Sequence, residues 1–378
     1  MNRKLLLALG LSMLLSGNVA AQEITIGLTM GTTGPGASLG IHYKNAFQLF
    51  PKTLGGQPVK FIMLEDATDA TIAAKNARKL ITEDKVDAIM GSVSVPSTTQ
   101  VAQIATETKT PMIALSPVAL PPDKLEWVFV VPQPVALMMG AVVDHMKAKN
   151  VKTYGYIGFT DSWGDLVLKA TGQHAGPYGM KVVASERYAR ADTSVTGQAI
   201  KILAANPDAV VVGGSGTGGA LPQLALVERN YKKQIYHNYG TVNREFIKVG
   251  GKAVEGVIAS TGPLIVFEEL PASNPIKAVA ADFVTRYEAK FGAGSRNAFA
   301  GYSYDGFLLL NAAVPKAMAK AKPGTPEFRQ ALRDALETVK EVVGTHGVYN
   351  MTAKDHTGLD SRARVLVQVQ NGAWRLMK

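Results

Sequence analysis

Cysteine is absent from the 378-residue chain. Its absence excludes a disulfide framework, thiolate-bound metals and a cysteine nucleophile. It also excludes the lipid-modified cysteine that anchors a bacterial surface lipoprotein behind its export signal. The function of this chain therefore cannot depend on thiol chemistry.

Long runs of basic or of apolar residues are also missing. Lys and Arg number 40 against 30 Asp and Glu, a formal net charge of +10, but no five or six basic residues follow one another. Aromatic residues do not interleave with them, as a nucleic-acid groove would require, so we expect no nucleic-acid partner. Beyond the N-terminus no segment is long and apolar enough for a membrane helix, so we expect a chain that is not embedded in a membrane.

Motifs for catalysis, metals and cofactors are missing or incomplete. The six histidines show no paired metal-ligand spacing, and residues 301–305 begin like a hydrolase nucleophile turn but lack its last glycine. Residues 214–219 contain G-x-G-x-x-G after a strand-like run, but the next such run ends at His237 and Asn238, without the acid that holds a ribose. We therefore predict no metal, no cofactor and no enzyme activity.

The N-terminus has the three parts of a secretion signal. A basic segment at 2–4 precedes an apolar segment at 5–15, and small residues follow at 19–21. About eleven apolar residues are too few to span a bilayer, which needs roughly twenty. We predict that residues 1–21 form a cleaved signal peptide and that the mature chain, beginning at Gln22, resides in the periplasm.

The rest of the chain alternates between strand-like and helix-like segments. Apolar runs such as 24–28, 59–64 and 86–90 are separated by stretches with apolar residues at helical spacing. This pattern predicts βαβ units around a parallel sheet, and it restarts near Pro134, which predicts a second array. Three late helical stretches, within 274–342, suggest a return of the chain to the first domain.

A glycine-rich loop at 31–40 joins the first expected strand to the first expected helix. In open α/β sheets such a loop lies at the carboxyl end of a strand, where small ligands bind. Ser38 is placed to cap the following helix. The loop lacks the Lys-Ser/Thr pair of a phosphate-binding loop, which argues against a nucleotide.

Other strand-ending loops are rich in hydroxyls, glycine and aromatic residues. Small hydroxyls and free backbone N–H groups can bind a carboxylate without a catalytic step. Trp163 and Tyr239 lie in such loops and can wall an apolar ligand body, as can Tyr304. For Tyr302 we expect packing in the core.

In its order of motifs the chain resembles the branched-chain amino-acid-type substrate-binding proteins of bacterial ABC importers, which have the type I periplasmic binding fold. The resemblance covers the whole mature chain. Its motifs are TGPGASLG at 33–40, EDATD at 65–69, ARKL at 77–80, DAIMGS at 87–92, TPMI at 110–113, DTSVT at 192–196, NPDA at 206–209 and YDG at 304–306.

The resemblance implies an α/β fold of two doubly wound, Rossmann-like lobes, joined by three crossings and closing on a ligand. Lobe 1 would comprise 22–138 and 263–345, and lobe 2 would comprise 139–262 and 346–378. It further implies a monomer that works with an inner-membrane ABC permease. The ligand-binding residues it implies are Ser38, Leu39, Val93, Ser94, Val95, Ser116, Pro117, Val118, Trp163, Ser215, Gly216, Tyr239 and Tyr304.

Departures from the amino-acid-binding members bear on the ligand. Those members place an acidic residue where Tyr239 falls, a threonine at Val118 and a serine near Val95. Without the acid, a buried ammonium group would be left unpaired, at a cost of several kcal/mol. Residues 192–197 and 214–217 resemble the subgroup that binds aromatic acids, so we expect a benzoate- or phenylpropanoid-like carboxylate. A branched-chain amino acid receptor, a ligand-sensing domain and a secreted hydrolase remain alternatives.

Overall fold

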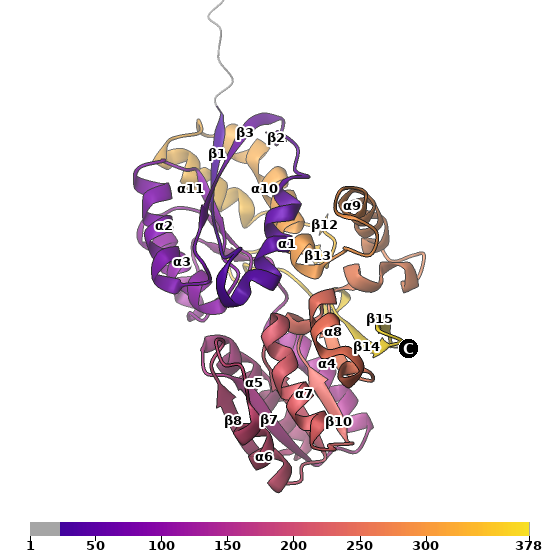
Figure 1. Cartoon of the computed structure of the whole chain (residues 1–378). Helices are drawn as coiled ribbons and strands as arrows, with labels where there is room; N and C mark the ends of the chain where they lie inside the picture. The colour runs from indigo at the N-terminus through magenta and orange to yellow at the C-terminus, as the bar shows by residue number, and fades with distance from the viewer. Residues whose placement is uncertain (1–22, 378) are drawn as a thin grey trace, which may run out of the picture.

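The structure is a computed structural model that describes residues 23–377 and contains two α/β lobes, one above the other in Figure 1. The predicted signal peptide, residues 1–21, lies outside the described residues. Each lobe is built on its own sheet, and parallel neighbours dominate both sheets. This is the two-lobed α/β architecture that the alternating sequence pattern predicts.

The first lobe has a six-stranded sheet in which only the short edge strand β2 runs antiparallel to its neighbour. The strand order reverses at β1, which has β3 on one side and β4 on the other. Such a reversal leaves a crevice at the carboxyl ends of the strands. In sheet order the strands are β2 (Thr53–Leu54), β3 (Gln57–Glu65), β1 (Ile24–Met30), β4 (Ala88–Gly91), β5 (Met112–Ala114) and β6 (Val128–Val130).

Helices cover both faces of this sheet. Side chains of α2 (Ala70–Thr82) and α3 (Val95–Glu107) form the apolar cluster on one face. The opposite face packs on helices from the two ends of the described chain, as Figure 1 shows. These helices are α1 (Ala37–Phe47), α9 (Ile276–Phe291), α10 (Ala298–Met318) and α11 (Pro326–Leu336), and the small pair β12 (Val342–Val343) and β13 (Val348–Tyr349) follows them.

The second lobe has a seven-stranded sheet in which the last two strands of the chain run antiparallel at one edge. In sheet order its strands are β15 (Ala373–Leu376), β14 (Val365–Gln370), β11 (Ile258–Thr261), β10 (Gln234–His237), β9 (Ala209–Gly213), β7 (Thr153–Phe159) and β8 (Lys181–Tyr188). Its helices are α4 (Val135–Ala148), α5 (Ser162–Ala175), α6 (Thr196–Ala204), α7 (Ala220–Glu228) and α8 (Arg244–Gly250).

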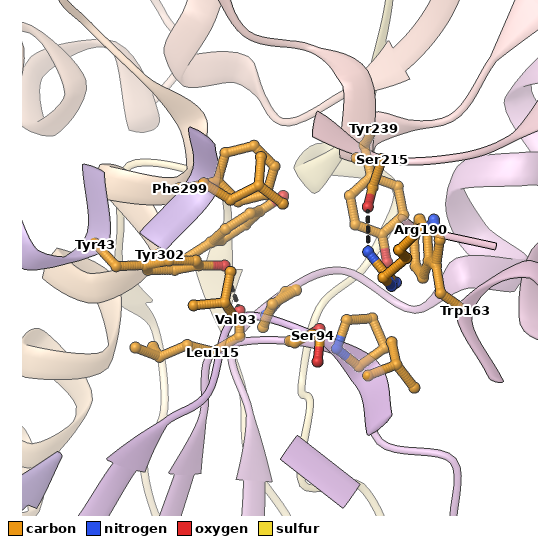
Figure 2. Close-up of a pocket in the computed structure, with 16 residues that line it drawn as sticks. Tyr43, Val93, Ser94, Leu115, Trp163, Arg190, Ser215, Tyr239, Phe299 and Tyr302 are labelled. Carbon is orange, nitrogen blue, oxygen red and sulfur yellow. Dashed lines mark hydrogen bonds between the residues drawn. The ribbon is translucent and has the colours of Figure 1, made fainter. Parts of the chain in front are cut away.

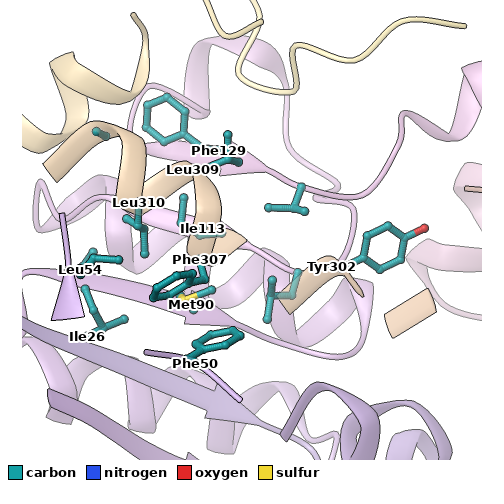
Figure 3. Packing of buried hydrophobic residues seen from close by; sticks show 14 of the residues in the cluster. Ile26, Phe50, Leu54, Met90, Ile113, Phe129, Tyr302, Phe307, Leu309 and Leu310 are labelled. Carbon is teal, nitrogen blue, oxygen red and sulfur yellow. The ribbon is translucent and has the colours of Figure 1, made fainter. Parts of the chain in front are cut away.

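Helix α10 fills the centre of the first lobe (Figure 3). The ring of Phe307 lies 4.8 Å from that of Phe50, and Leu309 and Leu310 are fully buried in the same cluster as Ile26 of β1. The late helices therefore complete the core of the lobe in which the chain begins. This confirms the return to the first domain suggested by the sequence.

The chain crosses between the lobes three times, and two crossings differ from the predicted boundaries. The boundary at 138/139 falls inside α4, whose Met138 and Met139 both pack in the core of the second lobe. The boundary at 345/346 comes too early, because Tyr349 and Met351 belong to the core of the first lobe. In each case the residues follow the sheet that buries their apolar side chains.

Local expectations differ at two helix starts. The residue that caps α1 is Gly36, and no side chain caps this helix, so the expected capping role of Ser38 is wrong. Helix α3 begins at Val95, three residues before the expected start, because Ser94 accepts a hydrogen bond from the Ser97 backbone N–H. The short elements β6, α8 and β11 were not predicted.

Candidate functional site

A pocket of about 350 Å³ lies between the two lobes, at the carboxyl ends of their strands (Figure 2). This volume includes space open to solvent at the mouth of the pocket. Both lobes contribute to its lining. The lining residues are Leu39, Tyr43, Val93, Ser94, Val95, Leu115, Ser116, Pro117, Pro132, Trp163, Arg190, Ser215, Tyr239, Gly240, Phe299 and Tyr302.

Arg190 is the one charged side chain among these residues, and three contacts fix its guanidinium group. Its Nε donates to the carboxylate of Asp161. Its Nη1 donates to Ser215 Oγ over 3.1 Å, the contact marked by a dashed line between these two residues in Figure 2. The group also lies over the ring of Phe159, with its central carbon 4.3 Å from the ring centroid. Within residues 23–377, Nη2 makes no hydrogen bond, so this nitrogen is free to donate to a ligand.

The first lobe contributes two serine side chains to the lining of the pocket, Ser94 and Ser116. Ser94 caps α3, and its hydroxyl donates to Ser97 Oγ over 2.9 Å. Because the first N–H groups of a helix have no intrahelical acceptor, this end of the 13-residue helix α3 favours negative charge nearby. Ser116 adds a second hydroxyl to the lining.

Aromatic side chains wall the remainder of the pocket. Trp163 and Tyr239 meet edge to face, with ring centroids 5.4 Å apart. Phe299 contacts both Tyr43 and Tyr302, with ring centroids 5.6 and 6.0 Å away. These rings present apolar surface from both lobes to whatever lies between them (Figure 2).

The polar atoms of these aromatic residues are bonded within the protein. Trp163 Nε1 donates to the Gly214 carbonyl over 3.1 Å. Tyr239 OH donates to the Gln133 carbonyl over 3.1 Å, and Tyr302 OH donates to Gln133 Oε1 over 2.7 Å. Burial raises the pKa of both tyrosines far above the ordinary value, so both hydroxyls stay neutral. The walls therefore offer ring surface and no negative charge.

Nine of the thirteen predicted site residues line this pocket. They are Leu39, Val93, Ser94, Val95, Ser116, Pro117, Trp163, Ser215 and Tyr239. Four do not, and the reason is local geometry in each case.

Ser38 and Gly216 meet each other across the cleft instead of lining the pocket. Ser38 Oγ accepts a hydrogen bond from the Thr217 backbone N–H over 3.4 Å. Gly216 has φ of +57°, and a Cβ at this position would lie 2.7 Å from Ser38 Oγ. The glycine thus permits a close approach of the two lobes beside the pocket.

Tyr304 and Val118 lie in packed regions away from the pocket. Tyr304 stacks on Phe283, with ring centroids 4.9 Å apart, and Arg286 covers its ring. Two residues along an α-helix rotate a side chain by about 200°, so Tyr302 faces the pocket while Tyr304 faces α9. Val118 packs against the cluster formed by α2 and α3.

Sequence reasoning missed seven lining residues. Two of them carried a usable signal: Arg190 lies two residues beyond the carboxyl end of β8, and Tyr43 lies one helical turn after Leu39. Tyr302, which we expected only in the core, is 1% exposed and lines the pocket as well. The others are Leu115, Pro132, Gly240 and Phe299.

Neither a metal-binding cluster nor a membrane-spanning helix is found in the part of the chain that the structure describes. Across residues 23–377, no group of three or more His, Cys, Asp or Glu side chains could hold a metal ion. Over the same residues, no helix has the length and apolar character needed to cross a bilayer.

Two α/β lobes with a pocket between them define a two-lobed binding protein. Residues 23–373 match the model of the family described as periplasmic binding protein, and the chain belongs to this family. An extracellular ligand-binding receptor from Rhodopseudomonas palustris HaA2 is 46% identical, with a TM-score of 0.93 over 94% of this chain and 100% of that one.

Two more distant proteins carry names that specify a ligand. An amino acid binding protein from Pseudomonas aeruginosa is 24% identical over 69% of this chain and 73% of its own length. A solute-binding protein of an ABC transporter from R. palustris, solved in complex with benzoate, is 19% identical, with a TM-score of 0.79 over 94% of this chain and 95% of that one. The second likeness shows the fold alone.

Proposed function

We propose that this protein binds a small aromatic carboxylate between its lobes and delivers it to an ABC permease of the inner membrane. The observation that carries the proposal is the charge of the pocket: Arg190 is its one ionic side chain, and no Asp or Glu lines it. A site with a single fixed cation and aromatic walls fits an aromatic acid that has no amino group.

The carboxylate binds at the Arg190 end of the pocket in this proposal. Asp161 and Ser215 hold two of the guanidinium nitrogens, and Nη2 remains for the ligand. Part of the arginine's charge is balanced by Asp161, which limits the cost of desolvating it when the lobes close. The Ser94 end of α3 provides further favourable potential for an anion.

The aromatic body of the ligand lies against the rings of Trp163, Tyr239, Phe299 and Tyr302. Edge-to-face contacts between aromatic rings contribute about 0.5–1.5 kcal/mol beyond the burial of their surface. The tyrosine hydroxyls donate to protein acceptors, so these walls do not demand a polar ligand. Benzoate- and phenylpropanoid-like acids match this combination.

A branched-chain amino acid is the second candidate, and the amino acid binding relative from P. aeruginosa favours it. Its α-ammonium group would need an acceptor in the pocket. The nearest carboxylate to Arg190 is Asp161, which already accepts from Arg190 and from the first N–H groups of α5. Leaving an ammonium group unpaired in a closed site costs several kcal/mol.

The transport role follows from the family and not from any residue of the pocket. In this proposal the protein is a monomer in the periplasm, has no catalytic step and carries its ligand through lobe closure. A sensing role, in which the closed protein is presented to a signalling partner, uses the same site. A neighbouring gene for a permease or ATPase favours transport, and one for a kinase favours sensing.

The test is a calorimetric titration of the refolded, ligand-free protein with two matched sets of compounds. The first set is benzoate, 4-hydroxybenzoate, cinnamate and 4-coumarate, with benzamide as the uncharged control. The second set is leucine, isoleucine and valine. We expect binding of one or more aromatic acids and none of benzamide. Binding of the aliphatic amino acids alone contradicts the proposal.

A further inference from the structure

Beyond the ligand pocket, a second polar contact joins the lobes, in addition to the hydrogen bond from the Thr217 backbone N–H to Ser38 Oγ. His42 on α1 of the first lobe and Glu245 on α8 of the second lobe approach to 3.1 Å between Nε2 and Oε1. The other ring nitrogen of His42, Nδ1, lies 3.0 Å from the hydroxyl of Tyr287 on α9. Neither His42 nor Glu245 lines the ligand pocket. Helices α1, α8 and α9 lie on the same side of the molecule in Figure 1.

We propose that His42 and Glu245 form a latch that holds the two lobes closed and that tightens when the imidazole is protonated. The latch is separate from the ligand pocket, and it does not depend on which ligand the protein binds. It would couple cleft closure to the acidity of the surroundings.

Burial makes the contact sensitive to charge. The side chain of His42 is 13% exposed and that of Glu245 is 33% exposed. Glu245 Oε2 is out of contact with solvent and has no hydrogen-bond partner within the described residues. A carboxylate held in this way is stabilised by His42 while the lobes are closed and by water when they open.

The charge state of Glu245 is constant over the relevant range. Burial raises the pKa of its carboxyl, but the hydrogen bond and the charge of His42, a backbone hydrogen bond and the charge of Arg244 together hold the pKa below the ordinary value. Glu245 therefore stays ionised until the pH falls below its lowered pKa. Histidine side chains change charge between about pH 5 and 8. A protonated imidazole attracts the ionised carboxylate, so protonation of His42 favours closure.

The neighbouring groups leave His42 as the switching element. Tyr287 stays neutral, because burial raises its pKa to about 12. Arg244 on α8 also acts on Glu245, but an arginine keeps its charge at all these pH values. On α9, Arg286 donates to Asp282 and Lys290 donates to the Gln48 carbonyl. Gly216 and Thr217, which face α1 from the second lobe, carry no charge.

The test measures closure directly and without ligand. Because the chain has no native cysteine, Lys75→Cys on α2 and Lys169→Cys on α5 can carry a pair of spin labels, one on each lobe. The protein is unfolded, dialysed and refolded to remove any bound ligand. Pulsed electron–electron resonance then gives the populations of short and long inter-lobe distances at pH 5.5 and pH 8.0.

We expect the ratio of closed to open molecules to be about three- to fivefold higher at pH 5.5 than at pH 8.0, the scale of a partly exposed ion pair. His42→Gln and Glu245→Gln should each abolish this difference. His42→Lys carries a permanent charge and should keep the higher ratio at both pH values. His174→Gln, on α5, is the matched control and should behave like the parent protein.

Two results overturn the proposal. One is a pH effect that survives in His42→Gln, and the other is an open form alone at both pH values in the parent. Near-ultraviolet circular dichroism of each variant shows whether it is folded, and His42→Lys gives an independent reading if His42→Gln is not. Because no ligand is present, none of these outcomes bears on the aromatic-acid proposal.

Discussion

Arg190 and Asp161 form an ion pair whose carboxylate also caps the helix that carries Trp163. Asp161 Oδ1 accepts from the Trp163 backbone N–H over 3.0 Å, while Oδ2 accepts from Arg190 Nε. A single acidic side chain thus positions both the cation at one end of the pocket and the indole in its wall. The two groups that we assign to the ligand's carboxylate and ring are held in a fixed relation.

Replacing Arg190 tests the anion-binding end of the pocket. Arg190→Gln should weaken binding of the best aromatic acid by about 30-fold or more, because losing one partner of a buried charge pair costs about 2–5 kcal/mol. Calorimetric titration measures this loss. Arg187→Gln is the control: Arg187 pairs with Asp165 and does not line the pocket, so affinity should change less than about twofold. Equal affinities for the two variants would place the carboxylate elsewhere.

Replacing Tyr302 and Tyr304 in turn tests which of these two residues of α10 faces the ligand. Tyr302→Ala should weaken ligand binding more than about tenfold, because it removes a wall of the pocket and leaves Gln133 Oε1 unpaired. Tyr304→Ala should lower the free energy of unfolding by about 2 kcal/mol through lost packing on Phe283, with little change in affinity. Urea denaturation and calorimetry on both variants separate the effects. The opposite pattern would mean that Tyr304 faces the ligand.

Ser38 tests the close approach of the lobes beside the pocket. Ser38→Trp places a bulky side chain where Gly216 and Thr217 of the second lobe make contact, so the lobes should not close and ligand affinity should fall at least about tenfold. Ile41→Trp, on the same helix at a position 45% exposed, should bind normally. Thermal melting should be similar for both. Unchanged affinity in Ser38→Trp would show that closure does not require this contact.

Asp305 is a buried carboxyl on α10 that contacts residues 345–349, just before the chain crosses between the lobes for the last time. It accepts hydrogen bonds from the backbone N–H groups of Thr345 and His346 and from Tyr349 OH. Burial raises its pKa to about 6, although these hydrogen bonds oppose the shift. The folded form therefore holds this proton more tightly than the unfolded form, and its stabilising contribution is lost as the pH rises from about 4 to 6.

Asp305→Asn should destabilise the protein at every pH, by about 1–3 kcal/mol, because an amide leaves a backbone donor unpaired. The penalty relative to the parent should be larger at pH 4.5 than at pH 7.5, since the parent alone gains stability from protonation. Urea titrations at the two pH values measure the difference. A penalty that is independent of pH would show that Asp305 titrates at its ordinary value.

Much of the fold follows from local sequence pattern. Apolar runs such as β1 and β7, and capping residues such as Asp69 before α2, specify strands and helices through short-range chemistry. Elements with weak local signals were missed, among them β6 with three residues and β11 with four. Their strand form depends on pairing with neighbours that are distant in sequence or on burial by other elements.

The pocket, like the fold, was predictable from the sequence only in part. The loops after the strands were identifiable, because parallel strands end at one edge of a sheet, and nine predicted residues from these loops and the helix starts that follow them line the pocket. The sequence did not show which side chain of a helix faces the pocket. Tyr302 lines it, whereas Tyr304 packs on Phe283 of α9. The orientation of α10 is set by the packing of Phe307 and Leu310 against β-strands that precede it by much of the chain.

Composition and pattern alone were sufficient to specify an α/β chain without thiols, with ligand loops at its strand ends, because these properties depend on residue type and near neighbours. Only the tertiary structure identified Arg190 as a residue of the pocket, its ion pair with Asp161 and the contact of His42 with Glu245. Each of these pairs joins residues from separate elements, and the last joins separate lobes. Their distances depend on how sheets and helices pack together, which no local pattern encodes.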